Sequence, residues 1–167
     1  MLQLDVARLK RSSGDTARFD LLEHLPPLEL SGDVISFVEP VNARLSALNT
    51  GKTLAVTGIV SGQLELKCGR CLGSFIYEFE VPFEENYAMT QEKPAEDLLS
   101  FSGDFLDVAP EVEKSIYLAL PMKALCSEEC QGLCHVCGRD LNEGACGCAA
   151  EEFDPRLGVL KELLKKD

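Results

Sequence analysis

Eight cysteines, arranged in four close pairs, constrain this chain of 167 residues more than any other feature. The pairs are Cys68 with Cys71, Cys126 with Cys130, Cys134 with Cys137, and Cys146 with Cys148. A short spacer lets the backbone wrap so that both sulfurs face one ion, and Zn²⁺ takes four such ligands in a tetrahedron. The pattern therefore indicates zinc sites, as long as the thiols are reduced.

The compartment decides whether the thiols are reduced. The N-terminal residues Met1–Asp5 show no charged region followed by a long apolar run, and no stretch reaches the length of a membrane-spanning helix. We therefore expect a cytoplasmic protein with reduced thiols and no membrane partner. In a secreted protein, the same even number of cysteines would predict four disulfides.

The last four cysteines are the strongest indication of a metal site. Cys134-His-Val-Cys137 is followed by Gly138, which can adopt a left-handed conformation, and Cys146 and Cys148 flank a glycine. Four thiols so close together in a polar, glycine-rich stretch are typical of zinc ligands rather than of buried thiols. His135 lies inside the first of these pairs, and we expect it to be a spacer rather than a ligand.

The other four cysteines leave two interpretations open. In the first, Cys68, Cys71, Cys126 and Cys130 form a second site, so that the chain binds two structural zinc ions. In the second, one site uses Cys126, Cys130, Cys134 and Cys137, which leaves Cys68 and Cys71 free. Cys68-Gly-Arg-Cys71 also has the spacing of a dithiol redox motif, so a redox protein is the alternative function. That motif normally begins a helix in a βαβ unit, whereas strand-like sequence flanks it on both sides here.

Hydrophobic periodicity predicts mostly strands. Apolar residues alternate with polar ones over 41–47, 54–66 and 75–83, and Asn49-Thr50-Gly51 separates the first two runs. This pattern indicates an antiparallel meander of long strands with one buried face. Residues 84–113 are predicted to be a loop with at most short strands.

Two helices are predicted after the strands. One runs from Val108 to Leu120, with Asp107 as its cap and Pro110 in its first turn. The other runs from Pro155 to about Lys165. The expected fold class is α+β, an antiparallel β-meander or partly open barrel with two helices and a Cys-rich zinc-knuckle segment.

The domain organisation follows from these elements. We expect an N-terminal strand and loop (1–32), an antiparallel β domain with a helix (33–121), a Cys-rich zinc-binding segment (122–150) and a C-terminal helix (151–167).

The charge of the chain bears on its partners. A net charge of −12 disfavours non-specific binding of the whole surface to nucleic acid, because that affinity comes largely from Lys and Arg. Residues 84–113 hold nine acidic residues against the single Lys93. Such a stretch is usually a solvated face. The more specific hypothesis is a docking surface for a basic protein.

No motif for catalysis is present. The sequence lacks a Gly-x-Ser-x-Gly nucleophile motif, a His-Glu-x-x-His zinc motif and a phosphate-binding glycine loop. All-cysteine zinc sites are normally closed and structural, without a position for substrate. We therefore expect a protein that is not an enzyme, with no catalytic residues, no cofactor besides zinc and no small-molecule substrate.

Several motifs, taken together and in order, resemble one family. They are Lys67-Cys68-Gly-Arg-Cys71-Leu72, Phe105-Leu-Asp107, Ile116-Tyr-Leu-Ala-Leu-Pro121, Gly132-Leu-Cys134-His-Val-Cys137-Gly138, Asp140-Leu-Asn142 and Asp154-Pro-Arg-Leu157. The chain resembles the YceD-like large ribosomal RNA subunit accumulation proteins. This resemblance implies a non-enzymatic role in ribosome biogenesis, in the processing or accumulation of 23S rRNA, and supplies no catalytic residues.

Two kinds of partner fit such a role. The first is a basic ribosomal or rRNA-processing protein that binds the acidic stretch at residues 84–113. The second is the 23S rRNA precursor, contacted through the zinc knuckle and nearby cations. Those cations are Lys123, Arg139, Lys161, Lys165 and Lys166.

Overall fold

Long antiparallel strands dominate the computed structural model, which describes residues 2–30, 32–89 and 98–148. The elements are β1 (Gln3–Asp5), the 3-10 helix η1 (Leu9–Arg11), β2 (Thr16–Glu23), β3 (Leu28–Leu30), β4 (Asp33–Phe37), β5 (Val41–Asn49), β6 (Thr53–Lys67), β7 (Ser74–Ala88), β8 (Leu99–Ser100), β9 (Phe105–Asp107) and α1 (Ala109–Ala119).

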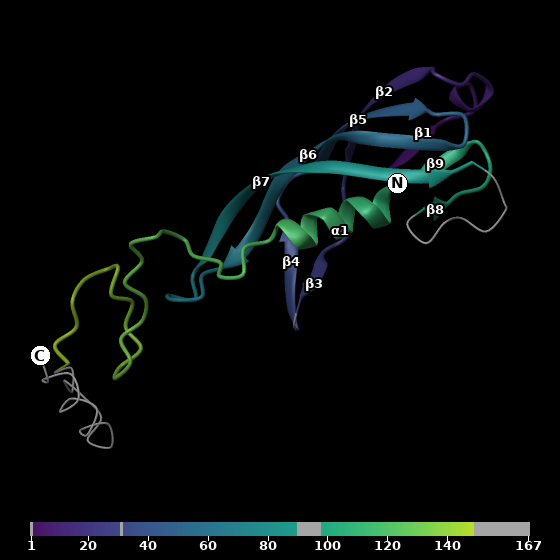
Figure 1. Cartoon of the computed structure of the whole chain (residues 1–167). Helices are drawn as coiled ribbons and strands as arrows, with labels where there is room; N and C mark the ends of the chain where they lie inside the picture. The colour runs from purple at the N-terminus through teal and green to yellow at the C-terminus, as the bar shows by residue number, and fades with distance from the viewer. Residues whose placement is uncertain (1, 31, 90–97, 149–167) are drawn as a thin grey trace, which may run out of the picture.

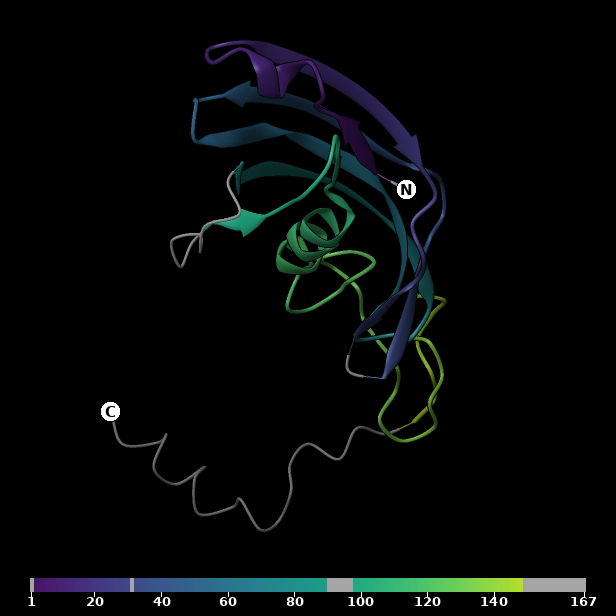
Figure 2. The same ribbon diagram turned by 90° about the vertical axis from the view of Figure 1, so that its right-hand side faces the viewer.

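The main sheet confirms the predicted meander. β5, β6 and β7 are consecutive antiparallel neighbours, and β2 extends the sheet beside β5. β4 pairs with β6 beyond the end of β5, and β3 pairs with β4. The sheet is strongly curved (Figure 2), but the described strands do not close into a barrel.

Alternation along the strands explains the single buried face. In β5, Val41, Ala43, Leu45 and Ala47 are buried, whereas the side chains between them point toward solvent. Gly58 of β6 allows β5 to approach closely, because a Cβ at this position would lie 2.9 Å from the Cα of Leu45. The concave face of the sheet therefore holds the hydrophobic core.

The N-terminal segment contributes more to the sheet than its sequence indicates. β2 pairs with β5 over its whole length, from Thr16 opposite Leu48 to Glu23 opposite Val41. β1 pairs with β9, so the N-terminus and the segment that leads into α1 form a small second sheet. β2 was not predicted from the sequence, although Ala17, Phe19 and Leu21 alternate with more exposed residues.

Helix α1 packs against β7 on the concave side of the sheet (Figure 2). Val112 and Ile116 are its buried residues, and Pro110 lies in its first turn, as predicted. The residue at the N-cap is Val108 rather than Asp107. The Asp107 carboxylate nevertheless accepts a hydrogen bond from the N–H of Ala109 at 3.0 Å, so it satisfies one free helix donor.

The prediction of two helices is not borne out. The described residues contain one α-helix, and the predicted second helix, from Pro155 to about Lys165, lies outside them. No helix in the described ranges is long and apolar enough to cross a membrane.

The β6–β7 hairpin positions the cysteines. β5 pairs with β6 only as far as Asn42 opposite Ser61, whereas β6 and β7 remain paired to Lys67 opposite Ser74. The hairpin therefore extends beyond β5. The Cys-rich segment lies next to its tip, beyond the end of α1 (Figure 1).

Candidate metal centres

The structure brings the eight cysteines together in two groups of four. We call Cys68, Cys71, Cys126 and Cys130 the hairpin centre, and Cys134, Cys137, Cys146 and Cys148 the loop centre. Within each group, all four sulfurs lie within 4.8 Å of one another. This grouping matches the two-ion interpretation of the sequence and not the one that combines Cys126 and Cys130 with Cys134 and Cys137.

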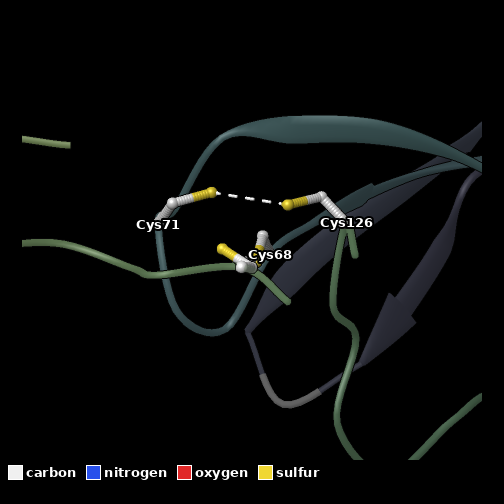
Figure 3. A group of neighbouring side chains, drawn as sticks. Cys68, Cys71 and Cys126 are labelled. Carbon is white, nitrogen blue, oxygen red and sulfur yellow. Dashed lines mark hydrogen bonds between the residues drawn. The ribbon is translucent and has the colours of Figure 1, made fainter. Parts of the chain in front are cut away.

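The hairpin centre is built on the turn between β6 and β7. The N–H of Leu72 donates to the carbonyl of Cys68 at 2.9 Å, and the N–H of Arg70 points at the Cys68 sulfur at 3.4 Å. Cys126 and Cys130 come from the segment after α1. Figure 3 shows the side chains of Cys71 and Cys126 pointing toward each other across this turn, with Cys68 beside them.

The loop centre repeats the same turn. The N–H of Gly138 donates to the carbonyl of Cys134 at 2.8 Å, and the N–H of Val136 lies 3.4 Å from the Cys134 sulfur. The residue after the second cysteine has a positive φ in both turns: it is 73° at Gly138 and 61° at Leu72. Two separate parts of the chain thus form the same cysteine knuckle.

The sulfur–sulfur distances fit a tetrahedral metal ion. Four sulfurs at about 2.3 Å from Zn²⁺ lie about 3.8 Å apart at the corners of a tetrahedron. The sulfurs of Cys68 and Cys130 are 3.8 Å apart, as are those of Cys71 and Cys126. A disulfide requires about 2.05 Å, so neither pair is a disulfide. Both centres could hold metal ions.

In the hairpin centre, the pKa values of Cys68 and Cys126 are shifted in opposite directions. N–H groups of Cys126, Cys71 and Arg70 lower the pKa of Cys68 to about 6. The thiols of Cys130 and Cys68, together with burial, raise the pKa of Cys126 to about 12. A cation would relieve this conflict, because it stabilises all four thiolates at once.

In the loop centre, the pKa values of Cys134 and Cys148 are likewise shifted in opposite directions. N–H groups of Cys137 and Val136 lower the pKa of Cys134 to about 6. The thiol of Cys137, followed by burial, raises the pKa of Cys148 to about 12.

Both histidines lie on the surface, His24 before β3 and His135 within the loop-centre knuckle. Two polar residues beside the cysteines were not singled out as site residues from the sequence. Arg70 donates from Nη1 to the carbonyls of Glu128 and Cys130, at 2.8 and 2.9 Å. Asn142 donates from Nδ2 to the Cys130 sulfur at 3.3 Å. One feature of the sequence could have pointed to Asn142: it lies between the two cysteine pairs of the loop centre.

The fold and these centres define a class of protein. In this class, a curved antiparallel sheet carries two four-cysteine groups at the tip of its longest hairpin. The family model described as large ribosomal RNA subunit accumulation protein YceD matches residues 56–164, which include all eight cysteines. The chain belongs to the YceD family.

Relatives from distant organisms support this membership. Protein YlbN of Bacillus subtilis is 27% identical over 97% of this chain and 96% of its own length. Protein Rv2926c of Mycobacterium tuberculosis is 30% identical over 98% of this chain and 81% of its own length. The chloroplastic large ribosomal RNA subunit accumulation protein YCED homolog 1 of Arabidopsis thaliana is 26% identical over 81% of this chain and 53% of its own length. No solved structure matches significantly.

Proposed function

We propose that this protein is a non-enzymatic factor in large ribosomal subunit biogenesis, which supports the processing or accumulation of 23S rRNA in the cytoplasm. The observation that carries this proposal is the family match, which spans residues 56–164 and so covers both cysteine centres and α1. A reducing compartment is consistent with cysteines that serve as ligands.

Two structural zinc ions are part of the proposal. Residues 122–148 contain no described helix or strand apart from an isolated bridge between Leu133 and Asp140. Such a segment has few backbone hydrogen bonds and little core of its own. Metal binding supplies folding free energy in segments of this kind. The zinc ions would therefore hold the Cys-rich segment against the β6–β7 hairpin.

A basic protein is the partner that the charge distribution favours. Glu78, Glu80 and Glu84 lie on the exposed face of β7. Asp104 and Asp107 are exposed in the segment that leads into α1. Together with the net charge of −12, these exposed carboxylates would attract a basic ribosomal or rRNA-processing protein, and the association would weaken as salt is added.

Direct binding of the 23S rRNA precursor is the less favoured mode. The parts of the chain that form the two centres, 67–73 and 122–148, carry as many acidic as basic side chains. The basic ones are Lys67, Arg70, Lys123 and Arg139, and the acidic ones are Glu128, Glu129, Asp140 and Glu143. RNA affinity depends on an excess of positive charge, which this region lacks.

The alternative function, a dithiol redox protein, would use Cys68 and Cys71. Cys68 is 0% exposed and is grouped with Cys126 and Cys130, so a disulfide substrate has poor access to it. Turnover in an insulin-reduction assay that is lost in Cys68→Ser would favour this alternative.

The decisive experiment compares rRNA in a strain that lacks the gene with rRNA in its parent. We expect the ratio of mature 23S to 16S rRNA to fall, and the intact gene to restore it. An unchanged ratio under all growth conditions would contradict the proposed function.

The partner is tested separately, by affinity capture at low and high salt. Changing Glu78, Glu80 and Glu84 to Gln should reduce capture of basic ribosomal proteins. A control variant with Asp15→Asn, Asp20→Asn and Glu29→Gln changes the net charge equally on exposed residues outside β7 and α1, and should retain capture. Equal losses in both variants would argue against a localised docking surface.

A further inference from the structure

A hydrogen bond connects the two cysteine centres. Asn142 lies between Cys137 and Cys146, so it belongs to the loop that closes the loop centre. Its Nδ2 donates to the sulfur of Cys130, a residue of the hairpin centre, at 3.3 Å. One centre therefore supplies a hydrogen-bond donor to a ligand atom of the other.

The orientation of the Asn142 amide is set by its other partners. Its Oδ1 accepts from the N–H of Gln131 at 2.8 Å. Its Nδ2 and its backbone N–H both donate to Oδ1 of Asp140, at 2.7 and 2.8 Å. With oxygen facing an N–H donor, the NH₂ group is directed toward the carboxylate and the sulfur. Asn142 is thus held in place to donate to Cys130.

The sulfur that receives this bond has little access to water. Cys130 is 5% exposed. A thiolate that is shielded from solvent depends on nearby donors to stabilise its charge. The amide of Asn142 supplies such a donor from outside the metal ligands.

Backbone contacts add a second connection between the centres. The N–H of Leu133 donates to the carbonyl of Arg70 at 3.2 Å, and the N–H of Leu141 donates to the carbonyl of Gly132 at 2.9 Å. Gly132 has a φ of 72°, and a Cβ there would lie 3.0 Å from the carbonyl oxygen of Arg70. The short link between Cys130 and Cys134 is therefore packed directly against the hairpin knuckle.

We propose that Asn142 is a positioning residue that couples metal binding at the two centres. Closure of the loop centre around its ion orders the segment that carries Asn142, and Asn142 then orients and stabilises the Cys130 thiolate. The hairpin centre consequently binds its ion more tightly when the loop centre is filled, and the reverse holds by linkage. This inference rests on the proposed zinc centres. Substitution of a residue that supports a ligand in this way typically lowers metal affinity by about 10- to 100-fold.

The test is a titration of the reduced, metal-free full chain with Co²⁺, followed by the sulfur-to-cobalt charge-transfer absorption. The step that disappears in Cys126→Ser is assigned to the hairpin centre. We expect Asn142→Ala to lower the Co²⁺ affinity of the hairpin centre by about tenfold or more. Its absorption should also shift to lower energy, because a thiolate without an N–H donor gives up charge more readily. Glu143→Ala, at the exposed neighbouring position, is the matched control and should change neither quantity.

The coupling itself is tested by disabling the loop centre with Cys146→Ser and Cys148→Ser. We expect the hairpin centre to bind Co²⁺ more weakly in this variant. Asn142→Ala should lower the affinity much less in this variant than it does in the wild type. Asn142→Asp provides a second variant, which keeps an acceptor for Gln131 but removes the donor to sulfur. Circular dichroism of the sheet, which lies outside this loop, verifies folding of each variant.

Two kinds of failure are distinguishable. Two bound ions with unchanged affinity and absorption of the hairpin centre in Asn142→Ala would overturn the coupling alone. A wild-type chain that binds no metal would overturn the zinc centres, and the coupling with them.

Discussion

The sulfur atoms of Cys71 and Cys126 lie 3.8 Å apart, although 55 residues separate them in the sequence. The first belongs to the turn between β6 and β7, and the second to the segment that follows α1. A metal ion at this place would thus link the sheet directly to the Cys-rich segment.

We predict two zinc ions per chain in the purified, reduced protein, measured by elemental analysis. Cys126→Ser should reduce the ratio to one, because a tetrahedral site with three thiolates binds zinc much more weakly. Cys148→Ser should have the same effect through the loop centre, whereas the control variant Lys123→Ala should keep both ions. One zinc ion in the wild type would contradict the two-centre arrangement.

Zinc should be released on acidification. Near neutral pH, metal binding must displace the protons of Cys126 and Cys148, whose pKa values are raised to about 12 in the metal-free protein. Below about pH 6, protons also compete for Cys68 and Cys134, whose pKa values are lowered to about 6. Affinity should therefore fall as pH falls, and fall more steeply below pH 6. A chelating dye that reports free zinc during an acid titration measures this, and a flat response between pH 8 and 5 would contradict it.

The two knuckles should respond in opposite ways to exchange of the residue after the second cysteine. Leu72 has a φ of 61° and a side chain that is 65% exposed, so Leu72→Gly removes backbone strain and loses little packing. Gly138→Ala introduces the corresponding strain at a φ of 73°. We expect the free energy of zinc binding to change by up to about 1 kcal/mol, favourably for Leu72→Gly and unfavourably for Gly138→Ala. Zinc competition measures both, and weaker zinc binding by Leu72→Gly would show that the leucine has another role.

The core of the sheet should be sensitive to truncation on its concave face only. Phe83 of β7 is 1% exposed, and Phe83→Ala should lower the free energy of unfolding by about 3–5 kcal/mol. Ile76 of the same strand is 52% exposed, and Ile76→Ala should change it by about 0.5 kcal/mol or less. Urea unfolding of metal-loaded protein compares the two. Similar losses would contradict the assignment of the faces.

Local patterns in the sequence predicted the main elements well. The period-two alternation of β5, β6 and β7 and the stripe of Val112 and Ile116 in α1 arise from burial of one face of each element. β2 was missed although Ala17, Phe19 and Leu21 alternate with polar residues, and these three side chains are only partly buried in the fold. Its pairing with β5 depends on residues that lie farther along the chain, from Val41 opposite Glu23 to Leu48 opposite Thr16.

The cysteine spacing by itself determined that this chain carries metal-type knuckles, because two thiols on one tight turn can face one centre. The spacing left the grouping of the pairs open. The tertiary structure decided it, because the long β6–β7 hairpin places Cys68 and Cys71 beside Cys126 and Cys130. The contact of Asn142 with Cys130 likewise appears only in three dimensions. A hydrogen bond between two centres depends on how their loops pack, and no local pattern encodes that packing.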